Sequence, residues 1–137
     1  MKRKATAVWN GTIKEGAGHL STKSGAVKEA QYSFNSRFAE GVGTNPEELI
    51  AAAHAGCFTM KLSGNLTEAG HNPEQLETEC TITLENGTIT SSHLEVKAKV
   101  PGIDKDKFDE LLDDAKKNCP VSRLLKADIS ADATMNG

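Results

Sequence analysis

The stretch TNPEELIAAAHAGCFTM, residues 44–60, predicts the central element of the fold. Asn45 suits the N-cap of a helix and Pro46 its first position, and the two glutamates that follow favour the positive end of the helix dipole. The helical pattern continues to Ala69, with Gly70 as a C-terminal stop. We therefore expect a helix of about 24 residues, roughly 36 Å long.

The same helix carries very little side-chain bulk ahead of Cys57. From Leu49 to Leu62 it is apolar or small on nearly every side, which indicates a buried helix. The alanines and glycine of residues 51–56 allow two helices to approach closely, and two copies crossing here would run antiparallel about a two-fold axis. Packing of this run beneath the chain's own sheet is the alternative. Composition does not choose between the two.

Cys57 lies in the middle of the helix, where the helix dipole has little effect on a thiol. A reactive thiolate there needs a cation close by. Glu47, His54 and Cys57 lie within about 80° of one another on a helical wheel. Glu47 and Cys57 are nevertheless about 15 Å apart along the axis. They cannot share a site within one straight helix, whereas an antiparallel crossing of two copies would bring Glu47 of one near Cys57 of the other.

Short strands and loops precede this helix in the predicted structure. Residues 2–10 and 12–20 alternate loosely and are expected to form strands around a tight turn at Asn10-Gly11. A short strand is expected at 32–34. Residues 35–44, which carry Arg37, are expected to form a loop.

Strands and helices also follow the central helix. A hairpin is expected at Asn86-Gly87, with Leu84 opposite Ile89 and a bulge near residues 91–93, where the apolar alternation changes parity. A second helix is expected from a cap at Asp104 to about Asn118, then a helical turn, then a strand at 127–135. This order of elements predicts an α+β fold.

Length and charge limit the class of protein. The 137 residues, with a net charge of −3, predict one domain spanning residues 1–137. Positive and negative residues are interspersed and form no basic stripe, so we expect no nucleic-acid partner. The N-terminus lacks the apolar stretch of a secretory signal, and no segment is apolar enough to cross a bilayer. We expect a cytoplasmic protein without a membrane partner.

The three cysteines differ in context. Their odd number and the lack of a CxxC motif argue against a structural disulfide framework. Cys80 alternates with Ile82 and Leu84 on a strand and is expected to be a core residue. Cys119 precedes Pro120 and would be the N-cap of a short helix, which favours a thiolate. A buried cap without a redox role is an equally open interpretation.

A metal site is the weaker interpretation of His54 and Cys57. Their spacing of three residues suits two ligands on one helix face, but zinc would need two more. The only further candidates are Cys119 and the distant His19, His71 and His93. We therefore expect neither a metal nor a cofactor.

Three motifs occur together at separations that are typical of one protein family. They are TNPEELIAAAHAGCF at 44–58, CPVS at 119–122 and SFNSRF at 33–38. They resemble the central helix, the second-cysteine motif and the arginine-bearing segment of the OsmC/Ohr family (osmotically inducible protein C and organic hydroperoxide resistance protein). The resemblance covers essentially the whole chain. It implies an OsmC-like fold, with antiparallel sheets around a long buried central helix, and an intertwined homodimer with active sites at the interface.

The resemblance also implies a thiol-dependent peroxidase. Cys57 would attack the peroxide and become a sulfenic acid, and Cys119 would resolve it to a disulfide that an external thiol or dithiol reduces. Arg37 would hold Cys57 as a thiolate and stabilise charge that develops on the peroxide. Glu47 would orient Arg37 through a bidentate ion pair.

The arginine position favours the OsmC branch, because the Ohr branch carries its arginine in a Gly-rich N-terminal loop. Organic hydroperoxides are the expected substrates, with hydrogen peroxide as a second. Candidates for an apolar approach to the site are Phe34, Phe38, Phe58 and Met60, although the last two cannot face the same pocket. Two alternatives remain: a non-catalytic small-molecule-binding protein of the same fold, and a cysteine-dependent hydrolase or transferase with His54 as base.

Overall fold

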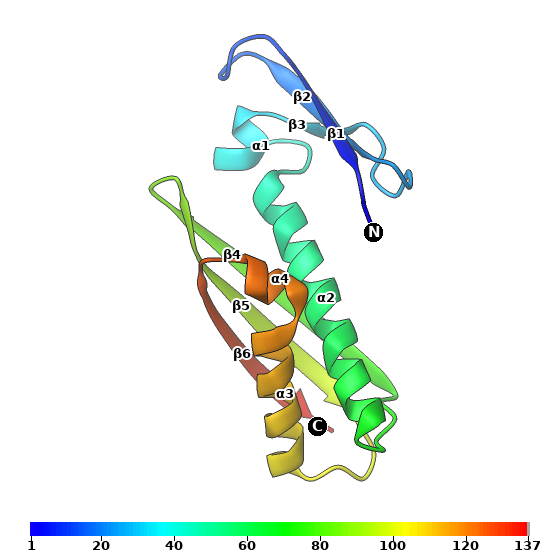
Figure 1. Cartoon of the computed structure of the whole chain (residues 1–137). Coiled ribbons are helices and arrows are strands. Elements are labelled where there is room, and N and C mark those ends of the chain that lie inside the picture. The colour runs from blue at the N-terminus through cyan, green and yellow to red at the C-terminus, as the bar shows by residue number, and fades with distance from the viewer. Residues whose placement is uncertain (137) are drawn as a thin grey trace. The chain divides into compact units, whose positions relative to one another are not determined.

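The chain forms two compact units in a computed structural model that describes residues 1–136. The N-terminal unit comprises Met1–Leu49, and the C-terminal unit begins at Ile50. Figure 1 labels the elements of both units. The single domain expected from the sequence stays a prediction.

The N-terminal unit contains a three-stranded antiparallel sheet in the order β1-β2-β3 (Figure 1). Its strands are β1 (Ala5–Asn10), β2 (Ala17–Thr22) and β3 (Ala30–Tyr32). Asn10 pairs with Ala17, so the connection spans residues 11–16. The tight Asn10-Gly11 turn was therefore a wrong prediction. The wider loop closes on itself instead, because the Gly16 N–H donates to the Thr12 carbonyl at 2.7 Å.

A short helix, α1 (Phe34–Phe38), lies where the sequence predicted a strand end and a loop. Ser33 and Ser36 form a reciprocal capping box: the Ser33 hydroxyl accepts from the Ser36 N–H, and the Ser36 hydroxyl accepts from the Ser33 N–H. This box satisfies two of the backbone N–H groups at the start of the helix, which have no partner within the helix. The prediction of a loop at 35–44 is wrong for its first four residues.

The central helix α2 (Pro46–Glu68) has the ends that the sequence predicts, to within a residue. The Asn45 side chain accepts from the Glu48 N–H at 2.7 Å, which confirms the N-cap. At the other end Gly70 has a φ of +88°. There the His71 N–H bonds to the Leu66 carbonyl at 2.9 Å, which is the long hydrogen bond of a Schellman stop.

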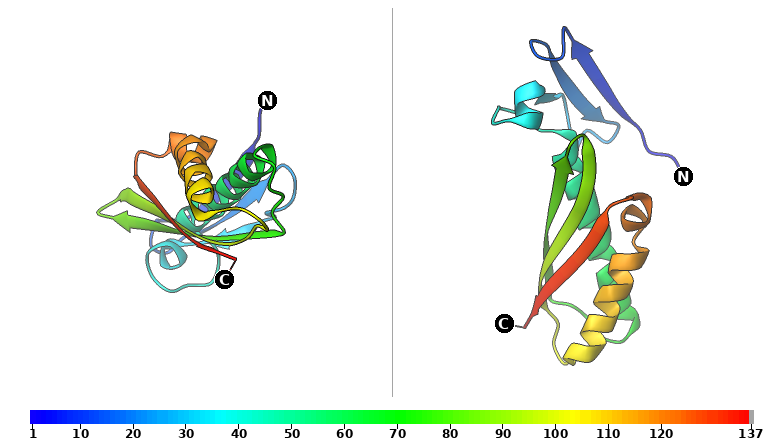
Figure 2. Two further views of the ribbon diagram at one scale, coloured as in Figure 1. Left: turned by 90° about the horizontal axis from the view of Figure 1, so that it is seen from below. Right: turned by 90° about the vertical axis from the view of Figure 1, so that its left-hand side faces the viewer.

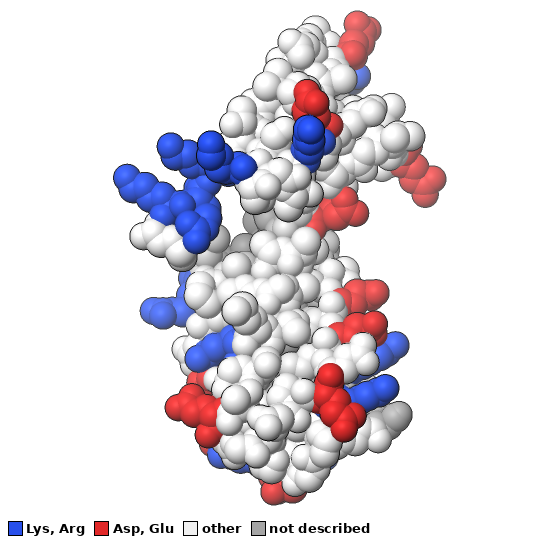
Figure 3. All heavy atoms as spheres, turned by 90° about the vertical axis from the view of Figure 1, so that its right-hand side faces the viewer, with Lys and Arg blue, Asp and Glu red and all other residues white. Residues whose placement is uncertain are grey.

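Helix α2 buries only one face in the single chain. Its buried residues are His54, Phe58, Leu62 and Leu66, each four residues from the next. Ala52, Ala53, Gly56 and Met60 are exposed. The prediction of a helix buried on nearly every side is therefore wrong for one chain alone. No charged residue lies between Glu48 and Lys61, and the face of the C-terminal unit in Figure 3 shows a broad uncharged area between charged margins.

The C-terminal unit contains a second sheet in the order β4-β5-β6. Strands β4 (Gln75–Glu85) and β5 (Thr88–Lys99) form the expected hairpin, with Leu84 opposite Ile89. Asn86 and Gly87 both have positive φ, +50° and +78°, as a two-residue type I′ turn requires. The register shifts between Thr83 and Leu84, which leaves Thr90 as the extra residue. The bulge therefore exists, one residue earlier than predicted.

Strand β6 (Asp128–Met135) pairs with β5 in parallel, so the expectation of purely antiparallel sheets is wrong for this pair. A parallel partner needs a long crossover. Here the crossover consists of α3 (Lys105–Asn118) and α4 (Pro120–Leu124). The predicted cap of α3 is confirmed, because the Asp104 side chain accepts from the Lys107 N–H at 2.8 Å.

The core of the C-terminal unit lies between its sheet and its helices. Figure 2 shows α3 and α2 on the same face of the sheet. Fully or nearly fully buried apolar side chains from these elements fill the space, among them Phe58, Leu62, Leu94, Val96, Phe108 and Cys119. Among residues 1–136, no helix has the length and apolarity required to span a bilayer.

Candidate active site

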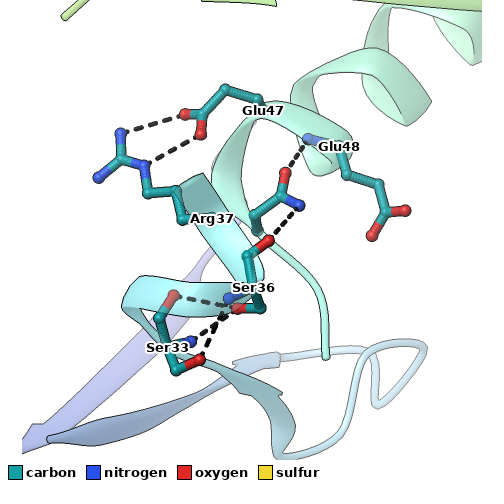
Figure 4. A network of polar contacts seen from close by, with 6 residues as sticks. Ser33, Ser36, Arg37, Glu47 and Glu48 are labelled. Carbon is teal, nitrogen blue, oxygen red and sulfur yellow. Dashed lines mark hydrogen bonds and ion pairs between the residues drawn. The ribbon is translucent and has the colours of Figure 1, made fainter. Parts of the chain in front are cut away.

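An ion pair joins the two helices of the N-terminal unit. Arg37 lies in the last turn of α1 and Glu47 in the first turn of α2. The guanidinium donates through Nε to Oε1 at 3.0 Å and through Nη2 to Oε2 at 3.1 Å (Figure 4). The hydrogen bond to Glu47 raises the pKa of Arg37. The structure thus contains the bidentate pair that the sequence predicted.

The same junction is braced by backbone and amide hydrogen bonds. Asn45 donates through Nδ2 to the Ser36 carbonyl at 3.0 Å while its Oδ1 caps α2, so one side chain ties the two helices together (Figure 4). The Arg37 guanidinium also lies 5.0 Å from the centre of the Phe38 ring. With these supports the guanidinium is fixed in direction, although 39% of its side chain is exposed. It is a preorganised cation whose Nη1 takes no part in the pair with Glu47.

Cys57 and Cys119 are neighbours in the C-terminal unit. Cys57 lies on α2 and is partly buried, and Cys119 is completely buried; both are free thiols. Burial raises the pKa of Cys57, a hydrogen bond from the Val121 backbone lowers it, and a hydrogen bond with the Cys119 thiol raises it, with an upward net shift. None of these groups is a cation. The unit therefore brings the two sulfurs together without supplying the charge that a stable thiolate needs.

Cys119 occupies the position that the sequence predicted for it, the N-cap of α4. Its Sγ accepts from the Ser122 N–H at 3.3 Å and contacts the Ser122 hydroxyl at 3.1 Å. Pro120 at the first helical position has no N–H to satisfy, and the cap serves the N–H at the third position. The cap at Cys119 is thus confirmed, and a redox role for its thiol stays a prediction.

His54 is held between two serines that the sequence did not single out. Its Nδ1 lies 2.5 Å from the Ser92 hydroxyl and its Nε2 lies 2.7 Å from the Ser122 hydroxyl. The ring is completely buried, and burial lowers its pKa. The Ser92 hydroxyl also contacts Cys80 Sγ at 3.2 Å. Both ring nitrogens are engaged with hydroxyls, which disfavours His54 as a direct base for Cys57.

The aromatic and methionine candidates for substrate contact lie in different surroundings. Phe34 and Phe38 pack against each other on α1 with ring centres 5.1 Å apart and ring planes tilted by 49°. Phe58 is fully buried in the core, whereas Met60 is 79% exposed. Their role in binding substrate stays a prediction. Across residues 1–136, no group of three or more His, Cys, Asp or Glu side chains is arranged to hold a metal.

Comparison with known proteins identifies the family. A family model described as OsmC-like protein matches residues 39–134. The chain is 46% identical over 134 residues to peroxiredoxin OsmC of Escherichia coli K12, covering 95% of this chain and 94% of the relative. It is 32% identical over 102 residues to an organic hydroperoxide resistance protein of Xanthomonas axonopodis pv. citri, covering 71% and 70%. The chain belongs to the OsmC family.

Solved structures show the same fold. An OsmC-like protein from Mycoplasma pneumoniae superposes with a TM-score of 0.77 at 14% identity, covering 98% of this chain and 97% of that one. The organic hydroperoxide resistance protein OhrB of Bacillus subtilis superposes with a TM-score of 0.67 at 22% identity, covering 97% and 98%. The predicted OsmC-like α+β fold is therefore confirmed.

Proposed function

We propose that this chain is a thiol-dependent peroxidase that reduces organic hydroperoxides to alcohols by cycling Cys57 and Cys119 between dithiol and disulfide. The observation that supports this most directly is that the two free thiols are close enough for Cys119 to raise the pKa of Cys57. The names of the relatives, a peroxiredoxin and an organic hydroperoxide resistance protein, point to the same chemistry.

The reaction has three balanced steps. The Cys57 thiolate attacks the distal peroxide oxygen, the O–O bond breaks, and the departing alkoxide takes a proton to become the alcohol, which leaves Cys57 as a sulfenic acid. The Cys119 sulfur then attacks Cys57, the S–O bond breaks, and hydroxide leaves as water. Two thiols, or one dithiol, of an external reductant finally restore both cysteines and are themselves oxidised to a disulfide.

The cation for Cys57 is proposed to come from the Arg37–Glu47 pair of a second copy of the chain. Glu47 and Cys57 are about 15 Å apart along α2, so one helix cannot place both in one site. The uncharged, small-residue face of α2 that is exposed in the single chain supports close antiparallel contact with another α2. The proposal therefore includes a homodimer with two active sites at its interface. This dimer would reduce organic hydroperoxides in the cytoplasm, and an external thiol would reduce it in turn.

Mass spectrometry after one equivalent of an alkyl hydroperoxide tests the reaction. We expect a Cys57–Cys119 disulfide in the wild type. The Cys57→Ser variant should lose hydroperoxide reduction, because it lacks the sulfur that accepts the oxygen. The Cys119→Ser variant should complete one turnover and then stop as a Cys57 sulfenic acid that dimedone traps.

Cys80→Ala is the matched control, since it removes the third thiol without touching the pair. Full multi-turnover activity of Cys57→Ser would refute the mechanism. A wild-type protein that binds but does not consume hydroperoxide would favour the alternative of a non-catalytic binding protein.

A further inference from the structure

A continuous chain of polar contacts runs through the otherwise apolar interior of the C-terminal unit. It starts at Cys119 Sγ, which lies 3.1 Å from the Ser122 hydroxyl. That hydroxyl lies 2.7 Å from His54 Nε2, and His54 Nδ1 lies 2.5 Å from the Ser92 hydroxyl. His54, Ser92 and Cys119 have no exposed surface, and Ser122 has 6%. These groups come from α2, β5 and α4, which fold together around them.

Burial creates a specific problem for Cys119. Its sulfur must lose a proton to attack a sulfenic acid, because the thiolate is the nucleophile. Water cannot collect that proton directly, since the residue is 0% exposed. Apart from the sulfur of Cys57, the side chain that contacts Cys119 with a group able to accept a proton and pass one on is Ser122. The proton therefore has a defined first step.

We propose that Ser122 and His54 form a proton relay that takes the Cys119 proton as its sulfur attacks the Cys57 sulfenic acid. The inference rests on the proposed function and adds two residues to its resolving step. Ser122 touches the reacting sulfur, His54 is the acceptor behind it, and Ser92 is a positioning residue that holds the ring.

The contacts fit one polarity of the relay. Ser92 accepts the Nδ1–H of His54, which leaves Nε2 with a lone pair toward Ser122. Ser122 donates its hydroxyl proton to Nε2 and accepts the proton of Cys119. As the S–S bond forms and the S–O bond breaks, the departing hydroxide recovers one proton from the imidazolium through the same hydroxyl and becomes water. Burial disfavours a charged His54, so the imidazolium is short-lived and releases the proton readily.

The Ser122→Ala variant separates this role from the peroxide step. In a single turnover with cumene hydroperoxide, sulfenic acid formation at Cys57 should stay within about twofold of the wild type. Disulfide formation should slow by at least about tenfold, because positioned general base catalysis typically contributes 10²–10⁴-fold. Dimedone should then trap Cys57 in the variant but not in the wild type. Ser122→Thr, which keeps the hydroxyl, should restore the resolving rate.

The pH profile distinguishes a relay from a packing role. The titratable groups that contact Ser122 and His54 are the thiols of Cys119 and Cys80, and Cys57 is the neighbour of Cys119. In the wild type the resolving rate should be nearly flat around neutral pH, since neutral His54 accepts the proton. In Ser122→Ala the resolving rate should rise about tenfold per pH unit, because hydroxide must then remove the proton of Cys119. Thr59→Val, which deletes a hydroxyl on the same helix that bonds to Ala55 and Thr78, is the matched control and should behave as wild type.

A variant-free measurement guards against misfolding of Ser122→Ala. In mixtures of H₂O and D₂O, a relay with two protons in motion gives a curved dependence of the wild-type resolving rate on deuterium fraction. A linear dependence, or a Ser122→Ala variant that forms the disulfide at the wild-type rate, overturns the relay alone. A wild-type protein that forms no Cys57–Cys119 disulfide overturns the proposed function and the relay with it.

Discussion

At the scale of single residues, the unusual feature is Cys57, whose surroundings within one chain disfavour the thiolate that the proposed reaction needs. Burial and the neighbouring Cys119 raise the pKa of Cys57, and only one backbone N–H from Val121 lowers it. Arg37 is by contrast a cation held in place by two hydrogen bonds to Glu47, and its Nη1 takes no part in either of them. The two features are complementary, because Cys57 lacks a nearby cation and Arg37 is a cation held in a fixed position.

Replacing Arg37 by Met should therefore raise the pKa of Cys57 further and slow its alkylation by iodoacetamide. A nearby cation typically shifts a pKa by about 1–3 units, so at pH 7 the rate should fall by roughly tenfold or more. The sign follows from the reactive species: the thiolate fraction rises with pH, and a higher pKa moves that rise to higher pH. Below the raised pKa the variant's rate should increase about tenfold per pH unit.

Arg37→Lys should give an intermediate rate, because it keeps the charge but loses the bidentate geometry. Arg3→Met, which removes an exposed arginine of the same unit, is the control and should leave the rate unchanged. An alkylation profile of Arg37→Met that coincides with that of the wild type would show that the guanidinium does not act on Cys57.

At the scale of elements, most local signals in the sequence were reliable, with the Asn10-Gly11 turn as the exception, and distant pairings were not. The Asn86-Gly87 turn fixes the register of its hairpin, so the pairing of Leu84 with Ile89 is confirmed. The cap at Cys119 is confirmed for the same reason, as its partner Ser122 is three residues away. Helix α1 was missed because five residues are too few to show a helical period.

Contacts across long stretches of chain have no such signal. The parallel pairing of β6 with β5 depends on where the crossover ends. The alternation of apolar residues along β6 is the same for a parallel and an antiparallel strand. The partners of His54 lie 38 and 68 residues away in the chain. A buried serine at an inward strand position, Ser92, is the one hint that a polar network was needed there. The fold was thus predictable, the pairing of Cys57 with Cys119 was available only from the family resemblance, and the contacts of His54 with the two serines were not predictable.

Two glycines near the end of α2 test how this helix stops. A Cβ added at Gly64 or at Gly70 meets no atom within 4 Å, so the two sites differ in backbone conformation and not in space. Gly64 is within the helix, and Gly64→Ala should raise the free energy of unfolding by about 0.5–1 kcal/mol. Gly70 has a φ of +88°, so Gly70→Ala should lower the free energy of unfolding by about 1–2 kcal/mol.

Urea unfolding followed by circular dichroism measures both changes, and each variant serves as the control for the other. A loss of stability in Gly64→Ala would contradict the open space around it in the single chain and place a neighbour against that position. Equal effects of the two substitutions would argue against a left-handed stop at Gly70.

At the scale of the whole molecule, the exposed small-residue face of α2 and the separation of Glu47 from Cys57 have one common explanation, the proposed dimer. Each site would then take its sulfurs from one chain and its cation from the other. Such an arrangement makes a prediction about mixtures that no site within a single chain would make.

Mixed dimers of Cys57→Ser and Arg37→Met chains should recover peroxidase activity that neither variant has alone. In such a dimer one site lacks both the thiol and the guanidinium, while the other site has both intact. Co-expressed chains with two different affinity tags allow the mixed dimer to be purified and its hydroperoxide consumption measured. About half the wild-type rate per dimer is expected, on the proposed two-site arrangement.

Mixed dimers of Cys57→Ser with wild-type chains are the control, and they should also retain about half of the activity. If each site lies within one chain, the mixture of the two variants stays as inactive as the separate proteins. Gel filtration of the wild type establishes independently whether two copies associate.

The parallel strand β6 has a consequence for folding during synthesis on the ribosome. Cys119 lies on the crossover that leads into β6, so its position against Cys57 is fixed only when the last strand has joined the sheet. About 60 residues separate the two cysteines, which a ribosome adds in roughly 3–12 s. During that interval Cys57 has left the ribosome, or is leaving it, with neither Val121 nor Cys119 beside it. Until Cys119 is in place, the newborn chain has Cys57 without the second thiol of its pair, although Cys80 has already been added.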